Sequence, residues 1–176
     1  MIRRLIIWGL GILLGLFLIY SLYDWIVTAT ALNSYEETFQ GLEHPQGTML
    51  IDAFKFKFSY YPATYRDESI RNRCVYLVGE VRGYSGDWDE LQAFYQGKTL
   101  VHGDTNEIHV GVFPIQFVSE EGAAPSLDMD SSFSYSPFDV DVMAKLESHY
   151  YFLGFPKGLG EGGKEMYVVY IAPDCG

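Results

Sequence analysis

The sequence predicts an α+β protein in which a single N-terminal transmembrane helix precedes a small extracytoplasmic domain. We expect that domain to contain a mostly antiparallel four-stranded sheet and two amphipathic helices. Three observations lead to this class: residues 5–23 carry no charge, four later segments have strand patterns, and two segments have helix start and stop residues. The order β-β-α-β-α-β does not alternate strictly, which favours antiparallel pairing.

Residues 5–26 form the predicted transmembrane helix. Its 19 uncharged residues, 5–23, would rise about 28 Å as a helix, close to the thickness of bilayer hydrocarbon. A helix is expected in lipid because it pairs its own backbone groups. Arg3 and Arg4 precede the apolar run, and basic flanks tend to stay in the cytoplasm. We therefore expect residues 1–4 in the cytoplasm and the domain on the opposite side of a cell membrane.

Aromatic and small residues add detail to this helix. Aromatic rings are favoured at the two membrane interfaces, and the candidates here are Trp8 at one end and Tyr20, Tyr23 and Trp25 at the other. Gly11 and Gly15 form a G-x-x-x-G pair, which permits close approach of a second helix in lipid. The sequence thus predicts membrane lipid and other transmembrane subunits as partners.

A cleaved secretory signal is the competing interpretation of the same segment. Residues 29–31 provide an A-x-A cleavage pattern after a basic start. The apolar run is longer than the roughly 7–15 residues of a typical signal, so we expect a retained anchor.

Residues 27–46 are expected to form a helical stalk between the membrane and the domain. This stretch is polar and poor in Gly and Ser, unlike a flexible linker. The helix is expected to continue to Gln40, with Gly41 as its stop and Pro45 beyond it. The acidic α+β domain then comprises residues 47–176.

Four strands are expected in the domain. Residues 49–61 alternate, with Phe54, Phe56 and Phe58 on a packed face and Lys55, Lys57 and Ser59 on a solvated one. Residues 74–81 and 164–173 are apolar on both faces and predict central strands. Residues 107–118 contain Pro114, where the apolar phase changes, which predicts an edge strand or a bulge. A polar connection is expected at 63–73 and a loop at 119–136.

Capping residues mark the two helices of the domain. Asp87 is placed to cap a short helix within residues 86–97, with Glu90 completing a capping box and Gly97 ending it. Ser136, Pro137 and Asp139 would start a second helix of about 16 residues, which Gly154 and Pro156 would stop.

Charge limits the partners that the domain can have. The chain has 12 Lys and Arg against 23 Asp and Glu, and Arg3 and Arg4 belong to the membrane flank. Nucleic acid is excluded as an expected partner, because its phosphates require a cationic surface. A basic protein partner fits the charge, although acidity also serves solubility alone.

Cys74 and Cys175 are the two cysteines of the chain. In an extracytoplasmic space a disulfide between them would persist. It would join the second strand to the C-terminus and close a loop of about 100 residues, which contributes about 4 kcal/mol in the chain-entropy account. Two free buried thiols are the alternative.

No motif in the sequence indicates a reaction. Gly158, Gly160 and Gly163 match G-x-G-x-x-G, but a helix precedes them and a strand follows, the reverse of a dinucleotide site. The acidic pairs lack the spacing of a calcium loop, and the histidines lack metal-ligand spacing. We therefore expect no cofactor.

The sequence favours a non-catalytic accessory subunit of a larger membrane complex, docked through its transmembrane helix and its acidic, aromatic-rich domain. A bacterial respiratory or photosynthetic assembly is one setting that would fit. Two alternatives stay open: a membrane-anchored ligand-binding or sensory ectodomain, and a membrane-anchored hydrolase.

Overall fold

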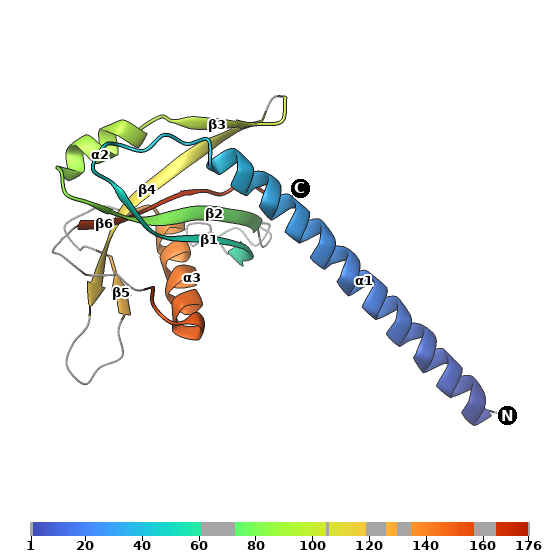
Figure 1. Cartoon of the computed structure of the whole chain (residues 1–176). Helices are drawn as coiled ribbons and strands as arrows, with labels where there is room; N and C mark the ends of the chain where they lie inside the picture. Colours follow the sequence, from blue (N-terminus) through green and yellow to red (C-terminus); the bar gives the residue numbers. More distant parts are fainter. Residues whose placement is uncertain are drawn as a thin grey trace.

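The computed structural model describes residues 2–60, 73–104, 106–118, 126–129, 135–156 and 165–175, with side chains in the first helix from Trp8 onward. A long helix projects from a domain in which helices lie on both faces of one sheet (Figure 1). The elements in order are α1 (Ile2–Phe39), β1 (Met49–Tyr60), β2 (Arg73–Tyr84), α2 (Trp88–Tyr95), β3 (Thr99–His102), β4 (Asn106–Val118), β5 (Ser126–Asp128), α3 (Pro137–Leu153) and β6 (Glu165–Ile171). The predicted α+β class with an antiparallel sheet is confirmed.

Within the described residues the sheet has six strands rather than the four predicted. Its order is β1-β2-β6-β4-β3, with β5 also pairing β4, and all described pairs are antiparallel. The prediction missed β3 and β5 because they contain only four and three residues, too few for an alternating pattern to be recognised. Strand β5 lies within the segment 119–136 that the sequence predicted to be a loop.

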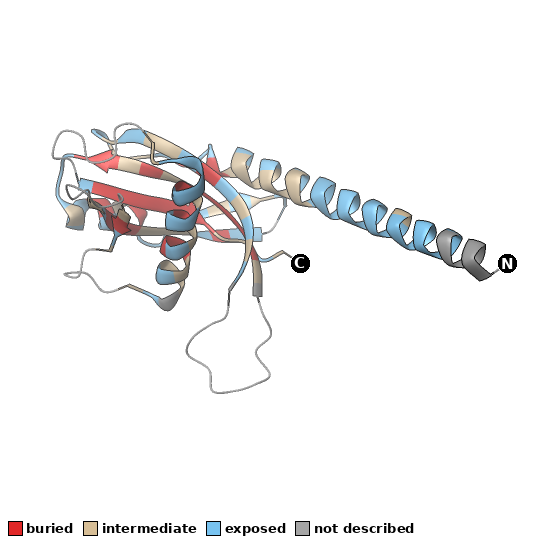
Figure 2. Cartoon of the chain, turned by 90° about the horizontal axis from the view of Figure 1, so that it is seen from below, coloured by how far each residue is buried: buried red, intermediate tan, exposed pale blue. Residues whose placement is uncertain are grey.

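The two predicted central strands are confirmed. Strand β2 lies between β1 and β6, and β6 lies between β2 and β4. Successive residues of β6 point to opposite faces: Val168 and Tyr170 join the core under α3, whereas Val169 and Ile171 join the core that includes α2 and the end of α1. Burial is concentrated in these strands, while the projecting part of α1 is exposed (Figure 2).

The prediction that the strand around Pro114 is an edge strand or contains a bulge is wrong. Strand β4 lies between β6 and β3, and its register against β6 is continuous from Val110 to Ile115, without a bulge. The carbonyl of Pro114 accepts a hydrogen bond of 3.2 Å from the hydroxyl of Tyr135. Its backbone therefore faces away from β6, in the stretch between the β3 and β5 pairings, where a missing N–H breaks no ladder bond.

Both domain helices begin at the predicted caps. Ser136 and Asp139 form the reciprocal capping box of α3, and Gly154 follows its last residue. Asp87 caps α2 by accepting from the Asp89 N–H at 2.8 Å. The Glu90 side chain does not accept a hydrogen bond from the N–H of Asp87, as a capping box requires. The predicted capping box is therefore wrong, and the Asp87 cap alone is confirmed.

Several predictions fall outside the described residues. They are the polar connection at 63–72, most of the loop at 119–136 and the glycine motif at 158–163. The domain boundaries proposed from the sequence, at 4, 26 and 46, stay predictions.

Candidate functional site

Helix α1 is one unbroken helix of 38 residues, about 57 Å long. Among the described residues it is the one helix whose length and composition would let it cross a membrane, a criterion that a signal sequence also meets. Its apolar window is not buried in the domain. The chain therefore presents a long apolar surface that the domain does not cover.

The predicted interface residues lie along this projecting part. Trp8 and Trp25 are separated by 17 positions, about 25 Å along the helix axis, and both rings are largely exposed. Tyr20 and Tyr23 are exposed near Trp25. A Cβ atom added at Gly11 or Gly15 would meet no atom within 4 Å apart from its chain neighbours and the backbone of the same helix, so the domain does not cover this face. The side chains of Arg3 and Arg4 lie outside the described residues, and their role in orientation stays a prediction.

The C-terminal part of α1 is packed into the domain. Phe39 and, just beyond the helix, Leu42 are buried in the core that β6 shares with α2, and Leu32 and Tyr35 pack against the same core. The segment predicted to be a stalk thus supplies core residues. Burial of one such Phe or Leu side chain stabilises a fold by about 2–5 kcal/mol, judged by truncation to Ala.

Polar contacts between β1 and α1 also hold the C-terminal part of the helix against the domain. Lys55 pairs with Glu36 and donates to Asn33, and Lys57 pairs with Asp24 at 3.0 Å. The predicted solvated face of β1 is therefore exposed as expected, but its two lysines contact α1. These pairs are one-third or more exposed, and such pairs contribute at most about 1 kcal/mol each. The apolar contacts of Phe39 and Leu42 therefore dominate.

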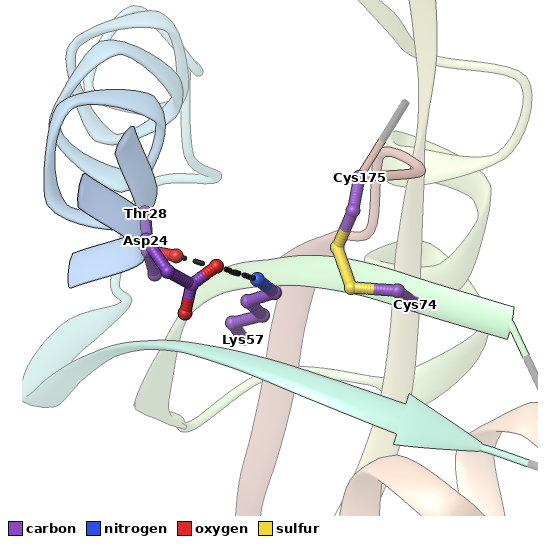
Figure 3. The surroundings of a disulfide bond; sticks show 5 residues. All are labelled: Asp24, Thr28, Lys57, Cys74 and Cys175. Atoms are coloured by element: carbon purple, nitrogen blue, oxygen red, sulfur yellow. Dashed lines mark hydrogen bonds and ion pairs between the residues drawn. A yellow bond between two sulfur atoms is a disulfide. The ribbon is translucent and has the colours of Figure 1, made fainter. Parts of the chain in front are cut away.

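The Cys74–Cys175 disulfide, predicted from the sequence, is formed. It ties the C-terminus to the start of β2, where the N–H of Cys175 also donates to the carbonyl of Cys74 at 3.0 Å. Figure 3 shows this bond near the Asp24–Lys57 pair, so both lie at the end of the domain from which α1 projects.

A half-buried polar cluster holds the segment after α1 against the sheet. His44 Nδ1 lies 2.7 Å from the hydroxyl of Tyr95, which lies 3.2 Å from the hydroxyl of Tyr167. Glu80 pairs with Arg82 and lies 3.4 Å from His44 Nε2. Sequence reasoning missed this cluster. The sequence feature that could have revealed the cluster is the pair Glu80 and Arg82. These two charged residues stand two positions apart in a mostly apolar strand, so their side chains lie on the same face of the sheet.

Burial lowers the pKa of His44 to about 4, and the positive charges of Arg82 and Lys98 act in the same direction. The carboxylate of Glu80 lies 3.4 Å from His44 Nε2 and also pairs with Arg82, whose positive charge opposes protonation of His44. Burial also raises the pKa of Tyr95 and Tyr167. At neutral pH all three rings are uncharged, so the cluster is a hydrogen-bonded support for residues 42–48.

Two cavities lie beside α1. The larger, of about 690 Å³, is lined by the start of β4, by residues 172–174 and by side chains that include Tyr35 and Phe138. The smaller, of about 420 Å³, lies between α1 and His102 of β3. His102 Nδ1 is 2.7 Å from the hydroxyl of Thr38, and its ring lies 4.3 Å from that of Tyr35. Tyr35 therefore forms a wall of both cavities.

No protein-family model, curated protein or solved structure matches this chain.

Replacing Phe39 with Ala is expected to lower the free energy of unfolding by about 3–5 kcal/mol. Lys57→Met should lower it by no more than about 1 kcal/mol, since it removes one exposed ion pair. Urea denaturation of the full chain in nonionic detergent, followed by near-UV circular dichroism, measures both. A larger loss for Lys57→Met would show that charge, rather than apolar packing, seats the helix.

Acidification is expected to destabilise the domain through His44. Its pKa in the folded protein lies below the unfolded value of about 6.5, so the unfolded chain binds more protons and stability falls as the pH drops from 6.5 toward 4. We expect a loss of about 1–2 kcal/mol, smaller than the full shift implies because water screens a half-buried ring. Urea midpoints across this pH range should flatten in His44→Gln but not in the exposed control His109→Gln. Parallel profiles for both variants would rule out His44 as the source.

Proposed function

We propose that this chain is a non-catalytic, single-span accessory subunit of a larger membrane protein complex. Helix α1 is retained and crosses the bilayer once, with residues 1–4 in the cytoplasm and the acidic domain on the extracytoplasmic side. The observation that carries the proposal is the continuity of α1: its first part is apolar and uncovered, and its last part belongs to the core. A bacterial respiratory or photosynthetic assembly would suit such a subunit.

The position of the A-x-A pattern supports retention of the helix. Residues 29–31 lie inside α1, between the Asp24–Lys57 pair and the buried Phe39. Cleavage after Ala31 would divide α1 just before Leu32, which packs against the core. Cleavage would also remove Asp24 and Thr28 from their contacts with Lys57.

The basic flank and the disulfide independently support the same orientation. Arg3 and Arg4 precede the apolar run, and basic flanks favour the cytoplasmic side. The disulfide belongs to the domain at the opposite end of the span, and such bonds persist in oxidising compartments outside the cytoplasm.

Exposed apolar side chains support an interaction role. Tyr151, Phe152 and Leu153, at the end of α3, each expose about three-quarters of their surface. Adjacent exposed apolar side chains are typical of surfaces that another protein covers. Together with the open glycine face of α1, they support docking both within and outside the membrane.

Mature protein purified from membranes is expected to keep its N-terminus and to carry its domain outside the cytoplasm. N-terminal sequencing should begin at Met1 or Ile2, and protease added to spheroplasts should digest the domain. A mature chain that begins at Leu32 would instead identify residues 1–31 as a cleaved signal. Digestion only after the spheroplasts are lysed would reverse the proposed orientation.

Replacing both Gly11 and Gly15 with Leu is expected to release the chain from its assembly, because added side chains prevent close helix approach. The domain should stay folded, since neither position contacts it. Co-purification in mild detergent measures the effect, with at least a tenfold loss of associated protein expected. Leu13→Phe, on the opposite side of the helix, is the matched control. Unchanged association of the double glycine variant would contradict docking through this face.

A further inference from the structure

The sheet divides between β4 and β6 at the end of the domain that faces α1. These strands pair from Val110 with Ile171 to Ile115 with Met166. Before Val110, β3 is the one described strand that pairs with β4. After Ile171 the chain follows β2, with Asp174 opposite Val75. The two strands therefore diverge, as Figure 1 shows. The cavity of about 690 Å³ lies between them.

Main-chain groups from both sides face this cleft. The N–H of Val110 donates to the carbonyl of Lys98, toward β3. Because direction alternates along an antiparallel strand, the N–H and C=O of Glu107 point away from β3 and into the cleft. On the other side, bonds from Tyr76 to Pro173 and from Cys175 to Cys74 flank Asp174, so the main chain of Asp174 points away from β2. Each edge thus offers a donor and an acceptor that a further strand would use.

The carboxylates that line the cleft give it a negative charge. Glu107 and Asp174 are exposed, and neither carboxylate has an ion pair with another described residue. Among the described residues that line the cavity there is no Lys or Arg. Tyr35 and Phe138, which pack on opposite faces of the sheet, both line the cavity. An occupant with an extended backbone and positive side chains would satisfy both the main-chain edges and the carboxylates.

We propose that this cleft binds an extended, cationic segment of a neighbouring subunit by strand addition. The segment pairs with the edge of β4 at residues 106–109 that no other described strand occupies, and its Lys or Arg side chains face Glu107 and Asp174. Strand addition takes affinity from main-chain bonds and specificity from side chains. This inference rests on the proposed function, and it specifies that the segment supplied by the partner subunit is extended and positively charged.

A blocked decapeptide of alternating Lys and Val, labelled with a fluorophore, is the probe. Its binding to the full chain in nonionic detergent is measured by fluorescence anisotropy. We expect the variant Glu107→Gln, Asp174→Asn to bind at least tenfold more weakly than the unmodified chain. The control Glu147→Gln, Asp89→Asn changes the same charge at exposed sites on α3 and α2 and should bind within about twofold of the unmodified chain.

A second probe tests strand pairing on the unmodified protein, so that no variant needs to fold. The same peptide with N-methyl groups at alternate residues keeps its charge but loses main-chain donors, and it should bind at least tenfold more weakly. Hydrogen exchange at residues 106–111 should slow only with the unmethylated peptide.

Three results would overturn the proposal that the cleft binds such a segment. The control variant could lose as much peptide affinity as the Glu107→Gln, Asp174→Asn variant, the methylated peptide could bind as tightly as the unmethylated one, or the unmethylated peptide could fail to bind. The proposed function is tested separately by co-purification. If the chain co-purifies with membrane partners but does not bind the peptide, only the proposal about the cleft fails. If it has no partners either, both fail.

Discussion

The packing of the end of α1 against the sheet is the contact on which the rest of the molecule depends. Phe39 and Leu42 place the helix in a core that also contains Tyr84, Leu91 and Ile171. Because the helix continues without a break from this core to Ile2, the domain cannot turn freely about its apolar segment. Whatever surrounds that segment therefore sets the orientation of the domain as well, which a flexible linker would not do.

Tyrosine hydroxyls show how a sheet with two packed faces accommodates polar groups. On the α3 side, Tyr150 donates to Asp52 at 2.9 Å and Tyr170 donates to Asp139 at 2.8 Å. On the opposite side, Tyr95 and Tyr167 lie within hydrogen-bonding distance of each other. Burial raises the pKa of Tyr150 and Tyr170, so both stay protonated donors. Large apolar rings thus fill the cores while each hydroxyl keeps a partner.

The sequence was informative where a signal is local and uninformative where a contact is distant. Charge-free length predicted the apolar helix, alternation predicted β1, and Ser136 with Asp139 predicted the start of α3. The disulfide was predicted because only two cysteines exist. The lysines of β1 looked solvated, since their partners on α1 lie 19 and 33 positions away. The cleft was equally hidden, because it arises where β4 and β6 part and no single segment carries its pattern.

The proposed membrane anchor and the proposed binding cleft have a joint consequence. Gly15 lies 20 positions before Tyr35 on the same rigid helix, about 30 Å along its axis, and Tyr35 lines the cleft. Successive residues of a helix turn by about 100°, so Tyr35 lies nearly opposite the glycine face, on the side of Leu13. A neighbouring subunit that packs on the glycines, as proposed, would reach the cleft only with a chain that passes around α1. Two contacts on one partner act together, because the first raises the effective concentration for the second. The cleft can then be selective with a modest affinity for any isolated segment, since only a subunit already beside the helix supplies its basic chain at high local concentration.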